Sequence, residues 1–295
     1  MDWRMKAALQ NVFSRVPGGE SLNHLFQKYV TRTLPIDARR LTEIVQRAAR
    51  HLEALGRHRH KPRAGDVFYE FGAGWDLASP LGFWANGVEH QLLIDIRDLL
   101  RLDVLNHTIG LFALVDLPLA RRPGAPLPNR AALLTDFGID FRAPRDARAT
   151  RLVDGSVDVI TSSNVLEHIP PSDLAAILRE CHRILADDGH MSMLVDYQDH
   201  YSYFDSQITP YNFLRFSDRT WRLFNPSLHY QNRLRHSDYV RLFEEAGFRI
   251  LEVQPAPVGD ADRSALRSVP LDRQFAQYAA DDLAVRDARF VLTKG

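Results

Sequence analysis

The sequence predicts an α/β fold in which a mostly parallel β-sheet carries helices on both faces. Residues 67–71 form a short β-rich run, typical of a buried central strand, and they lead into Gly72-Ala73-Gly74. The glycines allow a sharp turn and the close approach of a ligand. A helix is expected next, with Ser79-Pro80 at its start and Gly87 at its end. Strand, glycine turn and helix in this order are typical of the nucleotide-binding corner of an open α/β sheet.

A carboxylate follows on the next predicted strand, residues 91–95. Asp95 ends this strand about 20 residues after the glycines, where an acid binds both hydroxyls of a ribose. A dinucleotide-binding loop would have a glycine at position 77, which is Leu77 here, and Glu70 would repel a pyrophosphate. The corner therefore favours a ligand without phosphates and with a positive end.

These residues resemble the motifs of the class I S-adenosylmethionine-dependent methyltransferases. Residues 70–74 are similar to the first motif of that family, Asp95 to its ribose-binding acid, and Asp146-Ala147 to its acid near the adenine. Residues 154–170 are similar to its fourth strand and the loop that follows. Residues 185–190 stand for its Pro-Gly-Gly turn, with Asp in place of the proline and His in place of the last glycine.

The resemblance extends over residues 65–255 and departs from the family again at Asp76, which replaces the third glycine of the first motif. It implies a seven-stranded, mostly parallel Rossmann-like sheet with an antiparallel last strand, and S-adenosyl-L-methionine as the cofactor. The cofactor-binding residues that it implies are Glu70, Gly72, Ala73, Gly74, Trp75, Asp95, Ile96, Asp146, Ala147 and Asn164.

Composition limits the classes of partner. The 295 residues are enough for one large domain with an appendage. Basic and acidic residues both number 37, so the formal charge is zero, which argues against a nucleic-acid partner. The single cysteine, Cys181, excludes an internal disulfide and fits a reducing compartment. No apolar run has the length of a membrane span, and no signal-peptide core is found, so we expect a cytoplasmic protein.

Residues 1–63 are predicted to be a helical extension, and residues 64–295 the cofactor-binding domain. Apolar residues recur at helical spacing within residues 22–29 and 41–52, and Asp37 is a candidate cap for the second helix. The extension acts either as a lid over cofactor or substrate, or simply packs against the edge of the sheet.

The remaining chain supplies the other elements of the sheet. Further helices are predicted over residues 96–117, 131–137, 171–185, 238–246 (capped by Ser237) and 271–279. Further strands are predicted over residues 139–142, 157–161, 190–195, 248–253 and 285–293.

The segment after the predicted strand 190–195 has the groups that a proton-removing site would use. In this topology the carboxyl ends of the fourth and fifth strands face the ligand crevice. His200, beside Asp199, is predicted to be the base for a hydroxyl acceptor, with Asp196 in reserve; the alternative is an exposed loop histidine. His168 is expected mainly to shape the cofactor pocket.

Substrate contacts are predicted near the same segment. Arg233 and Arg235 are candidates for binding an anionic group through bidentate contacts, or they are surface charges. The aromatic stretch 201–221 either covers the substrate or fills a core. The substrate candidates are Tyr197, Asp199, Tyr211, Arg233 and Arg235, and no metal site is predicted.

Three functions stay open. The favoured one is methyl transfer to a small molecule, at an oxygen of a sugar, glycan precursor or secondary metabolite. An NAD-linked Rossmann oxidoreductase is the runner-up, which Leu77 and Glu70 oppose. The third is a protein that binds S-adenosylmethionine without turnover. The acceptor and the oligomeric state are left open.

Overall fold

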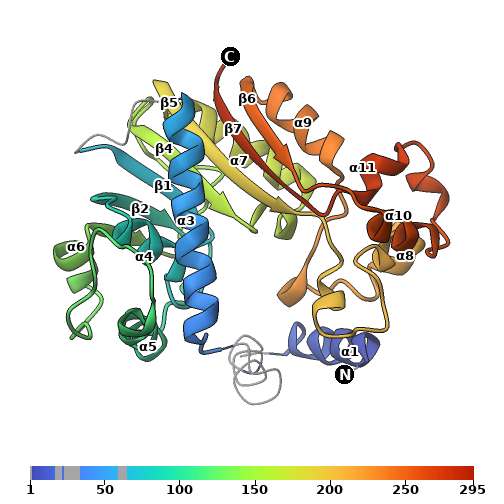
Figure 1. Cartoon of the computed structure of the whole chain (residues 1–295), viewed down its shortest axis with the longest axis horizontal. Coiled ribbons are helices and arrows are strands. Elements are labelled where there is room, and N and C mark those ends of the chain that lie inside the picture. The colour runs from blue at the N-terminus through green and yellow to red at the C-terminus, as the bar shows by residue number, and fades with distance from the viewer. Residues whose placement is uncertain (1, 17–21, 23–33, 59–64) are drawn as a thin grey trace.

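The computed structural model describes residues 2–16, 22, 34–58 and 65–295. Its seven-stranded sheet has the order β3-β2-β1-β4-β5-β7-β6 (Figure 1). Neighbouring strands pair in parallel, except that β7 is antiparallel to both β5 and β6. The strands are β1 (Val67–Phe71), β2 (His90–Ile94), β3 (Ile139–Arg142), β4 (Val157–Ser163), β5 (Leu185–Asp196), β6 (Phe248–Pro255) and β7 (Asp287–Lys294). The predicted fold class is confirmed.

Helices cover both faces of the sheet, with α3 and α4 on one face and α7 and α9 on the other (Figure 1). Side chains alternate along each strand, so Phe68 packs under α4 while Tyr69 packs toward α7. The helices are α1 (Trp3–Phe13), α3 (Ala38–His58), α4 (Ala78–Ala85), α5 (Leu102–Leu111), α6 (Ala132–Phe137), α7 (Pro171–Ile184), α8 (Asp218–Trp221), α9 (His236–Glu245), α10 (Asp260–Arg267) and α11 (Ala280–Ala284).

Two predicted helices differ from the structure in length or place. The helix expected over 96–117 is shorter, because α5 begins at Leu102 and only a 3₁₀ turn follows it. The helix expected over 271–279 is wrong: that stretch holds a 3₁₀ turn, Arg273–Phe275, and the helices lie on either side of it as α10 and α11. In this stretch Phe275 alone is deeply buried while Leu271 is exposed, so no apolar face supports a longer helix.

Three predicted turns and caps also differ. The turn expected at residues 185–190 is the first part of β5. Leu77, in a left-handed conformation, precedes α4 in place of Ser79-Pro80, and the Ser79 hydroxyl lies 3.4 Å from Glu70 instead. Ser237 does not cap α9; its hydroxyl donates to Asp282 at 2.7 Å. At Ser79 and Ser237, hydrogen bonds to residues outside the helix replace the capping bonds that the sequence predicts.

Part of the predicted N-terminal extension lies outside the described residues, namely the helical periodicity over 23–29 and the linker over 59–63. The Asp37 cap is confirmed, because the Arg40 amide donates to its carboxylate at 2.7 Å. The domain boundary at residue 63 stays a prediction. No described helix is both long enough and apolar enough to cross a membrane.

α1 docks through an aromatic cluster that is separate from the main core. Trp3 is buried against the rings of Tyr201 and Phe224, and its amide donates to Asp205 at 3.1 Å. Within the stretch 201–221, Tyr201, Tyr211, Phe213 and Trp221 are buried in this cluster. These aromatic side chains form a satellite core.

α3 is fastened to the sheet by a buried histidine. The ring of His51 has no exposed surface, and its two nitrogens lie 2.7 Å from the Ser192 hydroxyl of β5 and 2.9 Å from the Ser163 hydroxyl of β4. Burial, followed by the nearby arginines, lowers the pKa of His51 well below its usual value, so the folded protein keeps this ring neutral.

His51→Ala should lower the free energy of unfolding by about 2–4 kcal/mol, because it leaves a cavity and two unpaired buried hydroxyls. Unfolding in urea measures this, and His107→Ala, at a surface hydrogen bond, should cost less than about 1 kcal/mol.

The same substitution should flatten the pH dependence of stability. Below pH about 6.5 the unfolded chain takes up a proton at His51 that the folded chain refuses, so stability falls by up to about 1.4 kcal/mol per pH unit as pH falls. The His51→Ala variant should lose the part of the pH dependence of stability that His51 contributes. An unchanged slope would contradict a neutral buried His51.

Candidate active site

The glycine turn after β1 leaves an open space at the carboxyl edge of the sheet. Gly72 and Gly74 have φ of +78° and +76°, a conformation that favours glycine. A β-carbon on Gly72 would lie 2.7 Å from a methyl of Val165, so only glycine fits beneath the loop after β4. Nothing lies within 4 Å of a β-carbon placed on Gly74, and this open space is where a ligand can approach the backbone.

Two acids border this space. Asp95, at the end of β2, accepts hydrogen bonds from the amides of Gly74 at 3.2 Å and Arg97 at 3.0 Å. Burial raises its pKa, although these amides and Arg97 oppose the shift. Burial raises the pKa of Glu70 to about 8, and the Ser79 hydroxyl opposes that shift. Burial thus disfavours the charged form of both carboxyls. A ligand that donates hydrogen bonds to them, or carries a partial positive charge, would offset this effect.

The other predicted cofactor residues lie around the same edge. Ala73 is nearly buried, Trp75 is half-buried, and Ile96 is exposed beyond Asp95. Asp146 is paired with Arg148 at 2.7 Å, while Ala147 packs against the main core. The open space over Gly74, with Asp95 beside it, is where the sequence motifs predict the adenosyl part of S-adenosylmethionine.

A cavity of about 1080 Å³ lies at the carboxyl ends of β4 and β5. One wall comes from α3 and the residues before it, and a second from the segment between β5 and the 3₁₀ turn His200–Tyr203. Asn164, with a φ of +56°, lines the cavity beside the loop that follows β4. Strands β6 and β7 contribute Gln254, Asp287 and Arg289.

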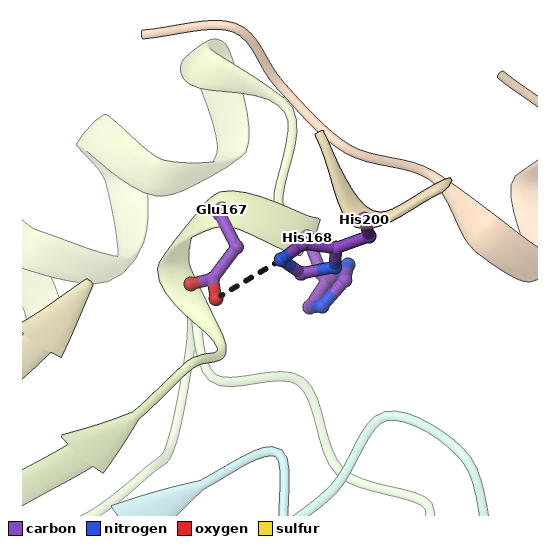
Figure 2. A group of neighbouring side chains, drawn as sticks. All are labelled: Glu167, His168 and His200. Atoms are coloured by element: carbon purple, nitrogen blue, oxygen red, sulfur yellow. Dashed lines mark ion pairs between the residues drawn. The ribbon is translucent and has the colours of Figure 1, made fainter. Parts of the chain in front are cut away.

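His200 lies among carboxylates and another histidine in this cavity. Its Nε2 is 3.3 Å from Oδ2 of Asp196 and 4.0 Å from Oε1 of Glu167 (Figure 2). The rings of His200 and His168 meet edge to face at 4.8 Å. The hydroxyl of Tyr203 donates a hydrogen bond to Asp196. A histidine and a carboxylate at this separation can receive a proton from a bound hydroxyl.

A family model described as a methyltransferase domain matches residues 112–253, which include β3 to β6 and the His200 segment. The chain therefore contains a methyltransferase domain, in agreement with the motifs of its sequence. It is an enzyme, and S-adenosyl-L-methionine is its methyl donor. The glycine turn at 72–74 precedes the matched residues, so the sequence motif and the family match are separate observations.

Solved structures with weak similarity include the YcgJ protein of Bacillus subtilis, with 16% identity over 84% of this chain and 99% of that chain, and a TM-score of 0.45. A methyltransferase of Methanosarcina mazei is 11% identical over 82% of this chain and 96% of that chain, at 0.47. The [4+2]-cyclase SpnF is 13% identical over 86% and 81%, at 0.49. Such low scores carry no conclusion about this methyltransferase. No curated protein matches its sequence significantly.

The methyltransferase holds two neighbouring carboxyls in different states. Burial alone would raise the pKa of Asp196, but His200 and Tyr203 hold it below its ordinary value. Burial, together with the charge of Asp196, raises the pKa of Glu167 well above its ordinary value. Asp196 is therefore the ionised partner of His200, whereas the surroundings of Glu167 favour its protonated form.

Asp199, predicted to orient His200, lies elsewhere. Its buried carboxylate accepts hydrogen bonds from the Tyr201 amide and the Asn212 side chain, both at 2.9 Å. The pKa of Asp199 is raised to about 6 by burial. The carboxylate at His200 is Asp196, the last residue of β5, because the chain bends between this strand and the 3₁₀ turn that begins at His200.

The other predicted substrate residues do not line the cavity. Arg235 is 1% exposed, and it donates to the carbonyl of Tyr197 at 2.6 Å. Arg233 donates to the carbonyl of Phe213 at 2.8 Å and pairs with Asp218. Tyr211 is buried in the satellite core and donates to Ala284 at 2.8 Å. These side chains hold the segments after β5 together.

Sequence reasoning missed the cationic side chains of the cavity. Arg47 and Arg50 of α3 and Arg289 of β7 line it, and none has a carboxylate within 4.0 Å among the described residues. A signal existed, because Arg47 lies on the same helix stripe as Ile44 and His51, which face inward. Arg289 likewise interrupts an apolar strand, next to Ala288 and Phe290.

Proposed function

We propose that this methyltransferase transfers a methyl group to an oxygen of a small acceptor that carries an anionic group, such as a carboxylate or a phosphate. The observation that carries the proposal is the His200–Asp196 pair in a cavity that also holds unpaired arginines. The cavity lies at the carboxyl edge of the parallel strands, and Asn164, which lines it, precedes Val165, which lies against Gly72 of the glycine turn.

The donor, when bound, supplies a methyl group on a sulfonium, which is already a good leaving group. The chain itself has to hold the acceptor oxygen in line with that methyl group and exclude water. Glu70, Gly72, Gly74 and Asp95 are proposed to bind the donor. Asn164, between this corner and the cavity, is proposed to contact its methionine part.

The acceptor hydroxyl must lose a proton as the bond from carbon to oxygen forms. We assign the proton to the His200–Asp196 pair, in which Asp196 is ionised and fixed by the Gln198 amide at 2.9 Å and by the Tyr203 hydroxyl. A positioned base contributes about 10²–10⁴-fold to such a transfer.

The arginines favour an anionic acceptor. Burial lowers the pKa of Arg47, and the charges of Arg40 and Arg50 lower it further. Burial and Arg50 lower the pKa of Arg289 in the same way, and its Nε is buried without a hydrogen-bond partner. Among the described residues, Arg47 and Arg289 make no ion pair within 4.0 Å, although acids lie farther away in and around the cavity, so an anionic ligand would supply the missing direct contacts.

Residues 1–63 are proposed to close over this site. Arg40, Ile44 and Arg47 put one stripe of α3 on the cavity wall, and α1 packs against the segment that follows β5. Hydrogen exchange that slows in α1 or α3 when donor and acceptor bind would support a lid.

The overall proposal is tested by incubating the protein with S-adenosylmethionine and a panel of hydroxy acids, sugar phosphates and their uncharged esters. Mass spectrometry should find methylated products from anionic members, and calorimetry should find binding of the donor and none of NAD. Methylation of the uncharged esters alone would contradict the anionic acceptor.

Asp95→Ala should weaken S-adenosylmethionine binding at least about tenfold, because it removes a charged acceptor of ribose hydrogen bonds that are each worth about 1.5–3 kcal/mol. Calorimetry measures the affinity. Asp103→Ala is the control, since this nearby acid makes an exposed ion pair with Arg101 and should leave the affinity nearly unchanged.

Arg47→Ala should raise KM for the anionic acceptor at least about tenfold and change kcat little, because it removes a charge-assisted contact present before and during transfer. Arg39→Ala is the matched control, on the outer side of α3 with an 88% exposed side chain. If donor affinity falls and KM for the acceptor does not, the arginines bind the methionine carboxylate instead.

His200→Ala should lower kcat by about 10²-fold or more while the affinity for S-adenosylmethionine stays unchanged. His168→Ala should weaken donor binding along with the rate if it shapes the cofactor pocket. Full turnover in His200→Ala would move the base elsewhere, with Asp196 the next to test.

A further inference from the structure

Glu167 is a buried acid that the proposed transfer does not use. It is 1% exposed, and both carboxylate oxygens are buried without a hydrogen-bond partner among the residues that the structure describes. An unpaired buried carboxyl costs several kcal/mol in general, and even in its protonated form it leaves a donor and an acceptor unsatisfied. Such a group, directed at His200 (Figure 2), points to a ligand that is bound between them.

The two histidines are prepared to bind such a ligand. Nδ1 of His168 lies 2.8 Å from the carbonyl oxygen of Tyr230, to which it donates, and this leaves the lone pair of Nε2 free. Nε2 of His200 is buried and makes no hydrogen bond of good geometry, although carboxylate oxygens lie close to it. A metal-binding histidine commonly has this arrangement, with its second nitrogen fixed by a carbonyl.

The spacing suits a metal ion. One ligand atom from each of Glu167, His168 and His200 lies within 4.8 Å of the other two. Ligands that bind an ion at about 2.1 Å lie about 3.0–3.4 Å apart, so side-chain rotations that shorten the longest separation by about 1.4–1.8 Å would close the site. The three come from the loop after β4 and the turn after β5, which meet at the cavity.

We propose that Glu167, His168 and His200 bind a divalent transition-metal ion on the wall of the acceptor cavity. Two imidazoles and a carboxylate favour Zn²⁺, Fe²⁺ or Mn²⁺ over Mg²⁺, which prefers oxygen ligands alone. Three protein ligands leave a coordination position open toward the cavity, as in catalytic rather than structural metal sites.

The role of the ion rests on the proposed methyl transfer, whereas its binding does not. An acceptor hydroxyl at the open position would become more acidic. The bond from sulfur to the methyl carbon breaks, the bond from that carbon to the acceptor oxygen forms, and the hydroxyl proton passes to Asp196. With the ion bound, the Nε2 lone pair of His200 is engaged, so within the His200–Asp196 pair it is the carboxylate that takes the proton.

Metal binding is tested on the full chain without donor or acceptor. Titration with Zn²⁺, and separately with Mn²⁺ and Mg²⁺, should show one site per chain that binds Zn²⁺ or Mn²⁺ more tightly than Mg²⁺. Glu167→Gln keeps the size of the side chain but cannot lose a proton to become a carboxylate ligand, and it should weaken binding more than about tenfold. His200→Ala should do the same. His190→Ala, whose ring lies near the Asp188 carbonyl on the surface, is the control and should bind like the wild type.

The outcomes separate the two proposals. Absence of Zn²⁺ and Mn²⁺ binding, or equal binding by all three variants, would overturn the metal site and leave methyl transfer standing. Metal binding that depends on Glu167 and His200, in a protein that methylates no acceptor, would support the site and contradict the proposed function. The affinity of Glu167→Gln for S-adenosylmethionine, if unchanged, shows that this variant is folded.

Discussion

The burial of polar groups at the carboxyl edge of the sheet is the constraint on which the whole site depends. Parallel pairing brings the ends of β1, β2, β4 and β5 to one edge of the sheet. Glu70, Asp95 and Asp196 lie at or next to the ends of three of these strands. Helices and loops then cover this edge and remove most of its water. Each acid responds to its own neighbours: Glu70 and Glu167 favour the protonated form, whereas His200 keeps Asp196 ionised. The same edge of the sheet thus holds acids whose pKa values are shifted in opposite directions.

Two helices near this edge, α3 and α1, are each fixed to the rest of the fold by a buried side chain. His51 fastens α3 to β4 and β5 through two serine hydroxyls, while Trp3 holds α1 against Tyr201 and Phe224. His51 and Arg47 lie on the same side of α3. The hydrogen bonds that hold His51 against the sheet therefore also fix the position of Arg47 in the cavity wall. Stability and recognition are therefore coupled in α3, and a change at His51 would reach the cavity through the position of that helix.

Local patterns in the sequence predict the strands, the glycine turn and the acid after β2, since a strand end and its next residues are close in the chain. They predict the candidate site less well. His200 meets Asp196 rather than its neighbour Asp199 because the chain bends between the end of β5 and the 3₁₀ turn at His200, and this bend was not readable from the residues. The meeting of Arg47 with Arg289 depends on β7 entering antiparallel beside β5. Arg233 and Arg235 look like surface charges or ligands in the sequence, yet backbone carbonyls engage them in the fold.

The cavity has a region rich in arginines and a region that can accept a proton, and this limits what can occupy it. Arg47, Arg50 and Arg289 line the wall made by α3 and β7, with Asp37 and Asp287 where these two elements begin, whereas Asp196, His200 and His168 lie at the ends of β4 and β5. A ligand that satisfies both regions needs an anionic group at one end and a hydroxyl, able to give up a proton or to bind a metal ion, at the other. A purely apolar acceptor would leave both regions desolvated and unpaired, which is costly. A hydroxylated anion is therefore the class of acceptor that this arrangement of charges favours on electrostatic grounds.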